Sequence, residues 1–207
     1  MAPRYDRHVH FITAFVLAGG KSTRMGSDKA FLELAGRPLL AYSLDLARSV
    51  ATEVKIVGDP DKFASFGAVI ADVYSDRGPL GGIHAALAGS STDWNLVLGV
   101  DLPFLRVSFL NYLLSEAQSS GAVVTVPFAN GYLHPLCAVY RKPFCLSAER
   151  ALSNGKNRVD ALFSDVLTRV ISEEALVRAG FDASIFRNLN TPEEWERAKQ
   201  EFAREQG

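Results

Sequence analysis

The chain is predicted to form an α/β fold, a three-layer sandwich in which helices cover both faces of a mostly parallel sheet. Two features of the sequence support this prediction. Short apolar runs alternate along the chain with longer segments in which apolar residues recur at helical spacing. The first of these runs, at 14–18, ends abruptly in a glycine-rich segment, as strands of open α/β sheets do where they form ligand sites.

Composition sets the class of protein. The 207 residues are 48% hydrophobic and 22% charged, which predicts one globular domain over 1–207 with a flexible segment at 1–10. The formal net charge of −1 provides no field for nucleic acid or an acidic membrane, so neither is an expected partner. No apolar run approaches the length of a membrane span, and the two cysteines are typical of a reduced cytoplasmic protein.

The first half of the chain alternates strands and helices. The short, partly β-branched run at 13–18 predicts a strand, and a brief extended piece follows at 31–34. Pro38 suits the first turn of a helix that continues to about Val50 with apolar residues on one face. Gly58 and the residues after it separate two further expected strands, at 54–57 and 68–71.

The second half continues the pattern. Residues 76–82, rich in glycine and proline, predict a turn that leads into a small-residue helix from Ile83, and 94–101 predicts a central apolar strand. The remaining expected helices lie at 106–118, 143–153, 158–166 and 173–179, and the remaining strands at 123–126, 136–140 and 169–171. Thr191, Pro192 and Glu194 form a capping box that predicts a last helix ending near 205.

The segment 14–29 contains the strongest functional signal. Three glycines, at 19, 20 and 26, let the backbone turn tightly, and three cations, Lys21, Arg24 and Lys29, stand among them. Backbone N–H groups and convergent cations are what a polyphosphate requires. The Walker pattern fails because Phe15 replaces its first glycine, and the dinucleotide fingerprint fails because Gly19 and Gly20 are adjacent.

Two aspartates are expected at the same edge of the sheet as this loop. Asp72 and Asp101 each follow a predicted strand, and parallel strands place their carboxyl ends at one edge. A carboxylate at the end of an apolar strand is costly unless it is paired or holds a cation. Asp101 therefore suits a Mg²⁺ ion that also binds phosphate oxygens.

The pattern L-A-G-G-x-S-x-R-M-G-x-D-K resembles the signature loop of nucleotidyltransferases, and it is most similar to that of the molybdenum cofactor guanylyltransferases. The resemblance implies a Rossmann-like nucleotidyltransferase fold and Mg²⁺-dependent transfer of GMP from GTP to molybdopterin. The products would be molybdopterin guanine dinucleotide and pyrophosphate. It also implies molybdoenzyme maturation proteins as further partners.

The resemblance assigns roles to particular residues. Arg24, Lys29 and Asp101 would be catalytic, with Asp101 also the metal ligand. The expected nucleotide contacts are Leu17, Ala18, Gly19, Gly20, Lys29, Gly58, Asp72, Gly81 and Asp101. The expected pterin contacts are His134, Asn188 and Asn190. The asparagine that the family carries after its second strand is absent, with Gly58 or Asp59 at that point.

Three alternatives remain open. A related enzyme could use another base or acceptor, as molybdopterin cytidylyltransferases and sugar-phosphate nucleotidyltransferases do. Leu17-Ala18-Gly19-Gly20, where enzymes that use CTP tend to carry Leu-Ala-Ala-Gly, favours GTP. The chain could also be a catalytically silent nucleotide-binding module, although the presence of both Lys29 and Asp101 argues against it. His84 and Cys137 are interpreted as packing residues.

Overall fold

The computed structural model describes residues 11–19, 28–74, 76–189 and 192–205. Its centre is an eight-stranded sheet in the order β10-β7-β9-β6-β1-β4-β5, with β8 paired to β7. The strands of this sheet are β1 (Ile12–Leu17), β4 (Glu53–Val57), β5 (Val69–Ile70), β6 (Trp94–Gly99), β7 (Val124–Ala129), β8 (Tyr132–Leu133), β9 (Cys137–Arg141) and β10 (Thr168–Ile171). A separate hairpin consists of β2 (Glu33–Leu34) and β3 (Arg37–Pro38).

Helices surround this sheet. They are α1 (Leu39–Arg48), α2 (Pro60–Phe63), α3 (Gly78–Ala88), α4 (Val107–Ser120), α5 (Phe144–Ser153), α6 (Glu173–Arg178) and α7 (Pro192–Glu205). Three short 3₁₀ turns are η1 (Lys29–Phe31), η2 (Asp160–Leu162) and η3 (Ala183–Phe186). No helix in the described part of the chain is long and apolar enough to cross a lipid bilayer.

The sheet is mostly parallel, as predicted, with one reversed strand in the main path. β1 pairs in parallel with β4 and β6, and β4 pairs in parallel with β5. β9 runs antiparallel to both β6 and β7. The reversal follows from the connection, because β7 turns back through β8 and a short segment into β9 without an intervening helix.

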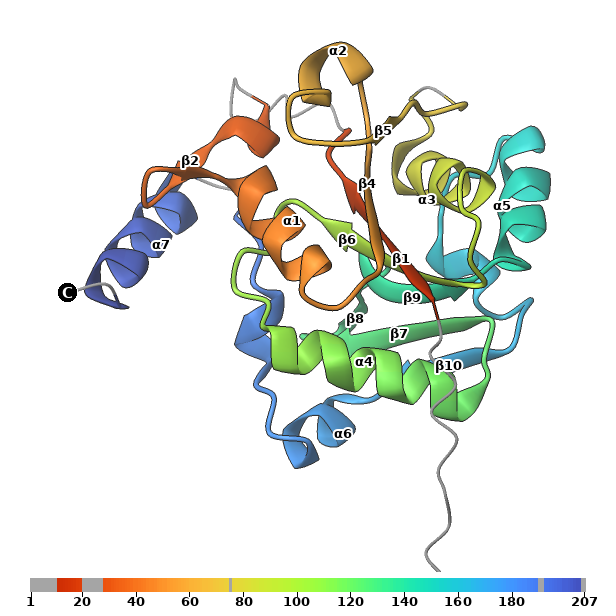
Figure 1. The fold of residues 1–207 in the computed structure, drawn as a ribbon. Coiled ribbons are helices and arrows are strands. Elements are labelled where there is room, and N and C mark those ends of the chain that lie inside the picture. Colours follow the sequence, from red (N-terminus) through yellow and green to blue (C-terminus); the bar gives the residue numbers. More distant parts are fainter. Residues whose placement is uncertain (1–10, 20–27, 75, 190–191, 206–207) are drawn as a thin grey trace, which may run out of the picture.

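Strand β1 lies between two hydrophobic cores, which gives the three layers. Ala14 and Val16 face one core, with residues of α1 and α4, while Phe15 and Leu17 face the other, with residues of α3 and α5. Alternate residues of a strand point to opposite faces, so a continuous apolar run indicates burial on both sides. Figure 1 shows α1 and α4 on one side of the sheet and α3 and α5 on the other.

A third, smaller core holds the C-terminal helix. Trp195 and Ala198 of α7 pack with Leu34 of the β2–β3 hairpin, Leu39 and Leu189, and all five side chains are buried. Helix α7 thereby lies at one side of the molecule, next to the hairpin (Figure 1).

Two predictions near the first helix are wrong in detail. Pro38 belongs to β3 and directly precedes α1, and Phe31 lies in η1 and not in an extended piece.

Two longer predicted elements also differ from the structure. Helix α3 begins at Gly78, so residues 78–82 are helical and are not part of the predicted turn. The glycines are needed there because a Cβ on Gly81 would lie 2.9 Å from the Tyr74 carbonyl oxygen, and one on Gly82 would lie 2.9 Å from Leu17. The helix predicted at 158–166 is wrong. Its apolar residues are buried as their spacing suggested, but only η2 is helical in that segment.

Candidate active site

The carboxyl ends of four parallel strands meet at one edge of the sheet. Gly19 lies two residues after the end of β1, and Gly58 directly follows β4. Asp72 comes two residues after β5, and Asp101 comes two residues after β6. Both aspartates thus lie beyond the ends of their strands and not within them, where their carboxylates are partly exposed. This edge is where open α/β sheets bind ligands.

Lys29 and Asp101 come together at this edge. The Lys29 Nζ atom lies 3.9 Å from Oδ2 of Asp101, and the two side chains are 21% and 26% exposed. Asp28 fixes the start of η1 by accepting a hydrogen bond from the Ala30 amide, and it also pairs with Lys62 at 3.2 Å. A Cβ on Gly99 would lie 2.8 Å from Oδ1 of Asp101, so the absence of a side chain at 99 makes room for this carboxylate.

The glycines at 19 and 58 bring two strand ends into contact. A Cβ on Gly19 would lie 3.6 Å from the Gly58 Cα, and a Cβ on Gly58 would lie 2.8 Å from the ring of Phe63. The N–H groups of Ala18 and Gly19 both donate to the Val57 carbonyl oxygen. A ligand that contacts Ala18 or Gly19 would therefore use groups other than their backbone N–H groups. Gly20 and Arg24, which were also predicted for the site, lie outside the described residues.

Asp72 packs against the first turn of α3. It accepts a hydrogen bond from the Tyr74 amide at 3.0 Å, and a Cβ on Gly81 would lie 3.1 Å from its carboxylate. Burial raises the pKa of Asp72, while the hydrogen bond from Tyr74 opposes the shift. The ring of Tyr74 meets the ring of the buried His84 of α3 edge-on, with the ring centroids 5.0 Å apart. The nearby Asp59 caps α2 through the Asp61 amide, so its side chain is engaged in the fold.

A cavity of about 720 Å³ opens beside Asp101. Its wall includes His134 and Asn188, two residues that the sequence placed with the second substrate. The full set of lining residues is Pro79, Asp101, Leu102, Asn130, Tyr132, Leu133, His134, Pro135, Leu136, Phe186, Arg187, Asn188 and Glu194. Small-molecule sites have volumes in this range. Asn190, the third residue predicted there, lies outside the described residues.

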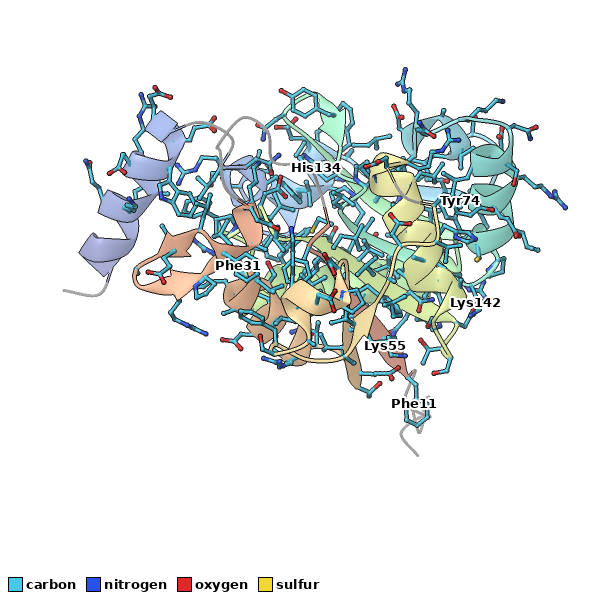
Figure 2. The ribbon with its side chains drawn as sticks, turned by 90° about the horizontal axis from the view of Figure 1, so that it is seen from above. Phe11, Phe31, Lys55, Tyr74, His134 and Lys142 are labelled. Carbon is cyan, nitrogen blue, oxygen red and sulfur yellow. The ribbon has the colours of Figure 1, made fainter. Side chains whose placement is uncertain are left out.

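His134 is held rigidly in the cavity wall. Its Nε2–H donates to the Ala129 carbonyl oxygen at 3.1 Å, and its ring stacks on Phe186 with centroids 4.4 Å apart. Burial lowers the pKa of His134, which favours the neutral ring. A neutral ring with its proton on Nε2 leaves Nδ1 as a hydrogen-bond acceptor. Figure 2 shows His134 on the side of the molecule away from Phe11 and Lys55.

Several lining residues had no role in the sequence prediction. Tyr132 is exposed at the cavity rim, and Glu194 and Arg187 contribute charges to the wall. Arg187 directly precedes Asn188, and this adjacency is the sequence feature that could have predicted Arg187 as a lining residue. The Oδ1 atom of Asn188 is buried without a hydrogen-bond partner among the described residues, as an atom that receives a ligand would be. His84 and Cys137 are buried, as predicted for packing residues, but the Nδ1 atom of His84 makes no hydrogen bond with the described residues. Burial raises the pKa of the Cys137 thiol.

The described residues contain no group of three or more histidine, cysteine or acidic side chains that could hold a metal ion alone. Asp101 is nevertheless suited to a Mg²⁺ ion, which binds through one or two carboxylates together with phosphate oxygens and water. Asp101 lines the cavity, and its Oδ2 atom lies 3.9 Å from the Lys29 Nζ atom. A metal ion held here would need further oxygen ligands from a bound molecule or water.

A mostly parallel sheet with a lysine and an aspartate that converge at its carboxyl edge is consistent with an α/β nucleotidyltransferase, the class that comparison with known proteins shows. The family model described as "MobA-like NTP transferase domain" matches residues 14–170, which is most of the chain. The chain belongs to this family of MobA-like NTP transferases.

Named relatives match over nearly their full length. The molybdenum cofactor guanylyltransferase of Desulfosudis oleivorans is 34% identical over 191 residues, covering 91% of this chain and 94% of the relative. A probable molybdenum cofactor guanylyltransferase of Pelotomaculum thermopropionicum is 36% identical over 190 residues, covering 90% and 91%. The crystal structure of molybdopterin-guanine dinucleotide biosynthesis protein A from Archaeoglobus fulgidus has a TM-score of 0.81 at 25% identity, covering 93% and 99%.

These comparisons confirm the predicted fold class, the family and the class of enzyme, a nucleotidyltransferase of molybdenum cofactor biosynthesis. The names of the relatives agree with the predicted guanylyl transfer. Nucleotidyltransferases of this family typically use a divalent metal ion.

Proposed function

We propose that this protein transfers GMP from GTP to molybdopterin, forming molybdopterin guanine dinucleotide and pyrophosphate. The observation that carries the proposal is the position of the Lys29–Asp101 pair. Asp101 lies in the wall of the cavity that also contains His134 and Asn188, so one carboxylate adjoins both the expected triphosphate site and the expected acceptor site. The relatives named as guanylyltransferases support the same reaction.

Each residue has a distinct task in this proposal. Lys29 neutralises charge on the triphosphate, and Arg24 of the same loop adds a second cation. Asp101 would hold a Mg²⁺ ion, which when bound would polarise phosphate oxygens and offset their charge. The terminal phosphate of molybdopterin attacks the α-phosphorus of GTP, a P–O bond forms, and the bond to pyrophosphate breaks. Because little covalent chemistry is required of the protein, positioning and electrostatics dominate the rate.

The nucleotide and the acceptor occupy adjoining parts of the same edge. Leu17 to Gly20, Gly58, Asp72 and Gly81 form the proposed nucleotide side, where missing side chains let a flat base approach the backbone. His134, Asn188 and Asn190 form the proposed acceptor side. There the Nδ1 atom of a neutral His134 and the Oδ1 atom of Asn188 would accept hydrogen bonds from the N–H groups of a pterin.

Pyrophosphate release tests the reaction. The purified protein is incubated with Mg²⁺, molybdopterin and GTP, CTP or ATP in turn. We expect pyrophosphate to be released from GTP, and only when molybdopterin is present. A preference for CTP would instead assign the chain to cytidylyl transfer. Tight GTP binding without turnover, in the presence of both Mg²⁺ and acceptor, would identify a silent nucleotide-binding module.

Three further parts of the proposal concern the setting of the enzyme. Mg²⁺ is the proposed metal ion, and replacement by Ca²⁺ after chelation should support nucleotide binding with far less turnover. The chain acts as one catalytic domain in the cytoplasm. Maturation proteins of molybdoenzymes are the proposed recipients of the product.

A further inference from the structure

Arg187 joins two elements that are distant in the sequence. Its Nη1 atom donates to Oε1 of Glu201 on α7 at 3.2 Å, and its Nη2 atom donates to Oε2 of the same carboxylate. Its guanidinium also lies 4.0 Å from the centre of the Phe104 ring. One side chain therefore contacts the C-terminal helix through a bidentate ion pair and the chain just after Asp101 through a stacking contact. We refer to Arg187, Glu201 and Phe104 as the arginine clamp.

The arginine clamp depends on chemistry that only arginine supplies. A planar guanidinium can donate two parallel hydrogen bonds to a carboxylate while its face covers an aromatic ring. A lysine could make a point contact with Glu201 but could not maintain both interactions. Ion pairs on the surface usually contribute little, whereas a bidentate pair stacked on a ring keeps its geometry better.

The arginine clamp is built into the wall of the acceptor cavity. Arg187 lines the cavity itself, and its neighbours in the sequence are Phe186, which stacks on His134, and Asn188, whose Oδ1 is buried without a partner in the described part of the chain. Phe104 follows Asp101 by three residues. The arginine clamp thus connects the segment that carries the proposed acceptor contacts to the segment that carries the proposed metal ligand.

The charges of the lining residues also support a role for Arg187 in binding the acceptor. Among the described residues that line it, Arg187 carries the only permanent positive charge, against the carboxylates of Asp101 and Glu194. Its Nε atom is buried and makes no hydrogen bond with the described residues. Glu201 offsets part of this charge, so the guanidinium would act on an anionic acceptor through its fixed position and its Nε–H group.

We propose that Arg187 is a positioning residue for the acceptor, and that Glu201 and Phe104 hold it in place. The proposal rests on the function proposed above. The arginine clamp orients the 186–188 segment against Asp101, so that the acceptor phosphate lies in line with the nucleotide. The contacts described above at the ends of β1, β4 and β5 involve none of the three clamp residues.

Steady-state kinetics of Glu201→Gln and Arg187→Lys test this proposal. Both variants keep the size of the side chain but weaken the bidentate pair. We expect the KM for molybdopterin to rise by about 10-fold to 100-fold, since small misplacements of a reactant have effects of that size. The KM for GTP should stay within about twofold of the wild-type value. The double variant should be no worse than the more affected single variant, because both changes break one interaction.

Arg169→Lys provides the matched control. Arg169 of β10 also makes a two-donor ion pair with a glutamate, because its Nε and Nη2 atoms both donate to Oε2 of Glu116 on α4, at 3.1 Å and 2.7 Å. It does not line the cavity beside Asp101. This variant should leave both KM values unchanged. Melting temperatures of all variants are measured in parallel, because a purely structural role for Arg187 would lower stability and alter both KM values together.

The outcomes separate the two proposals. If wild-type protein shows no guanylyl transfer, the proposed function fails before any variant is compared. If wild-type protein is active and both clamp variants have an unchanged KM for molybdopterin, the arginine clamp has no positioning role. Equal increases in both KM values, accompanied by a lower melting temperature, would also overturn it.

Discussion

Replacement of Asp101 by asparagine is expected to separate catalysis from stability. Asparagine matches aspartate in shape, so it fits the space that the missing side chain of Gly99 leaves and keeps its place in the cavity wall. The change removes one negative charge that lies 3.9 Å from Lys29 and that would hold the metal ion. Its effects on folding and on turnover can be estimated separately from the geometry of the site.

The effect on folding is small. Two unit charges 3.9 Å apart interact by about 4 kcal/mol at an effective dielectric constant of about 20. Both side chains are roughly a quarter exposed, so solvent screening and desolvation reduce the net contribution to about 1 kcal/mol or less. For a chain of this size, 1 kcal/mol shifts the melting temperature by about 2–4 °C.

The effect on turnover is much larger. Charge stabilisation by a bound metal ion contributes several kcal/mol to a phosphoryl transfer reaction, and each 1.36 kcal/mol changes a rate about tenfold. We therefore expect Asp101→Asn to lower kcat for pyrophosphate release from GTP by at least about 100-fold. Thermal unfolding, followed by circular dichroism, should show a shift of no more than about 4 °C.

Asp45→Asn serves as the matched control. Asp45 pairs with Arg37 at 2.6 Å on the surface of α1, where both side chains are about half exposed. This variant loses an ion pair of similar type away from the carboxyl edge and should retain its turnover. If Asp101→Asn keeps near-normal kcat, or if it loses activity only because it unfolds, then the assignment of Asp101 as metal ligand is wrong.

Three other predictions concern packing and ionisation. Gly58→Ala would place a Cβ 2.8 Å from the buried ring of Phe63 and should destabilise the protein by about 1–3 kcal/mol in urea unfolding; an unchanged midpoint would contradict this. Burial lowers the pKa of His134, so its contribution to stability is present above about pH 6.5, the unfolded pKa, and is lost as pH falls through the folded pKa. His134→Phe should therefore lose less stability between pH 7.5 and 5 than wild type. An equal loss would contradict the lowered pKa of His134. Burial raises the thiol pKa of both Cys137 and Cys145, so folded Cys145→Ser protein should not react with a thiol reagent at pH 8 until denatured, whereas rapid labelling would contradict the burial of Cys137.

Most of the fold was predictable because burial leaves a local pattern. The continuous apolar run of β1 indicated a strand covered on both faces, and Phe15 and Val16 do face opposite cores. The same reasoning failed at 158–166, where Val159 and Leu162 have helical spacing and are buried without an α-helix. Spacing records which side chains are buried, and several backbone paths can bury the same residues.

The site was predictable in its parts more than in its assembly. The phosphate-loop pattern and the position of Asp101 after an apolar strand could be read directly from the sequence. The start of α3 could not be predicted, because glycines normally disfavour helices. Here glycines are required by the close approach of Asp72, Tyr74 and Leu17. The contacts of Arg187 could not be predicted either, since Glu201 and Phe104 come from distant segments.

By itself, the sequence determined the residue types and the local elements of this protein. These include the glycines and cations of the first loop, the apolar strands, and the acidic residues that follow them. Only the tertiary structure decided that β9 runs antiparallel, that Lys29 meets Asp101, and that Arg187 joins α7 to the cavity beside Asp101. The physical reason is that propensity and periodicity act between near neighbours in the chain, whereas strand order and side-chain contacts depend on how distant segments pack.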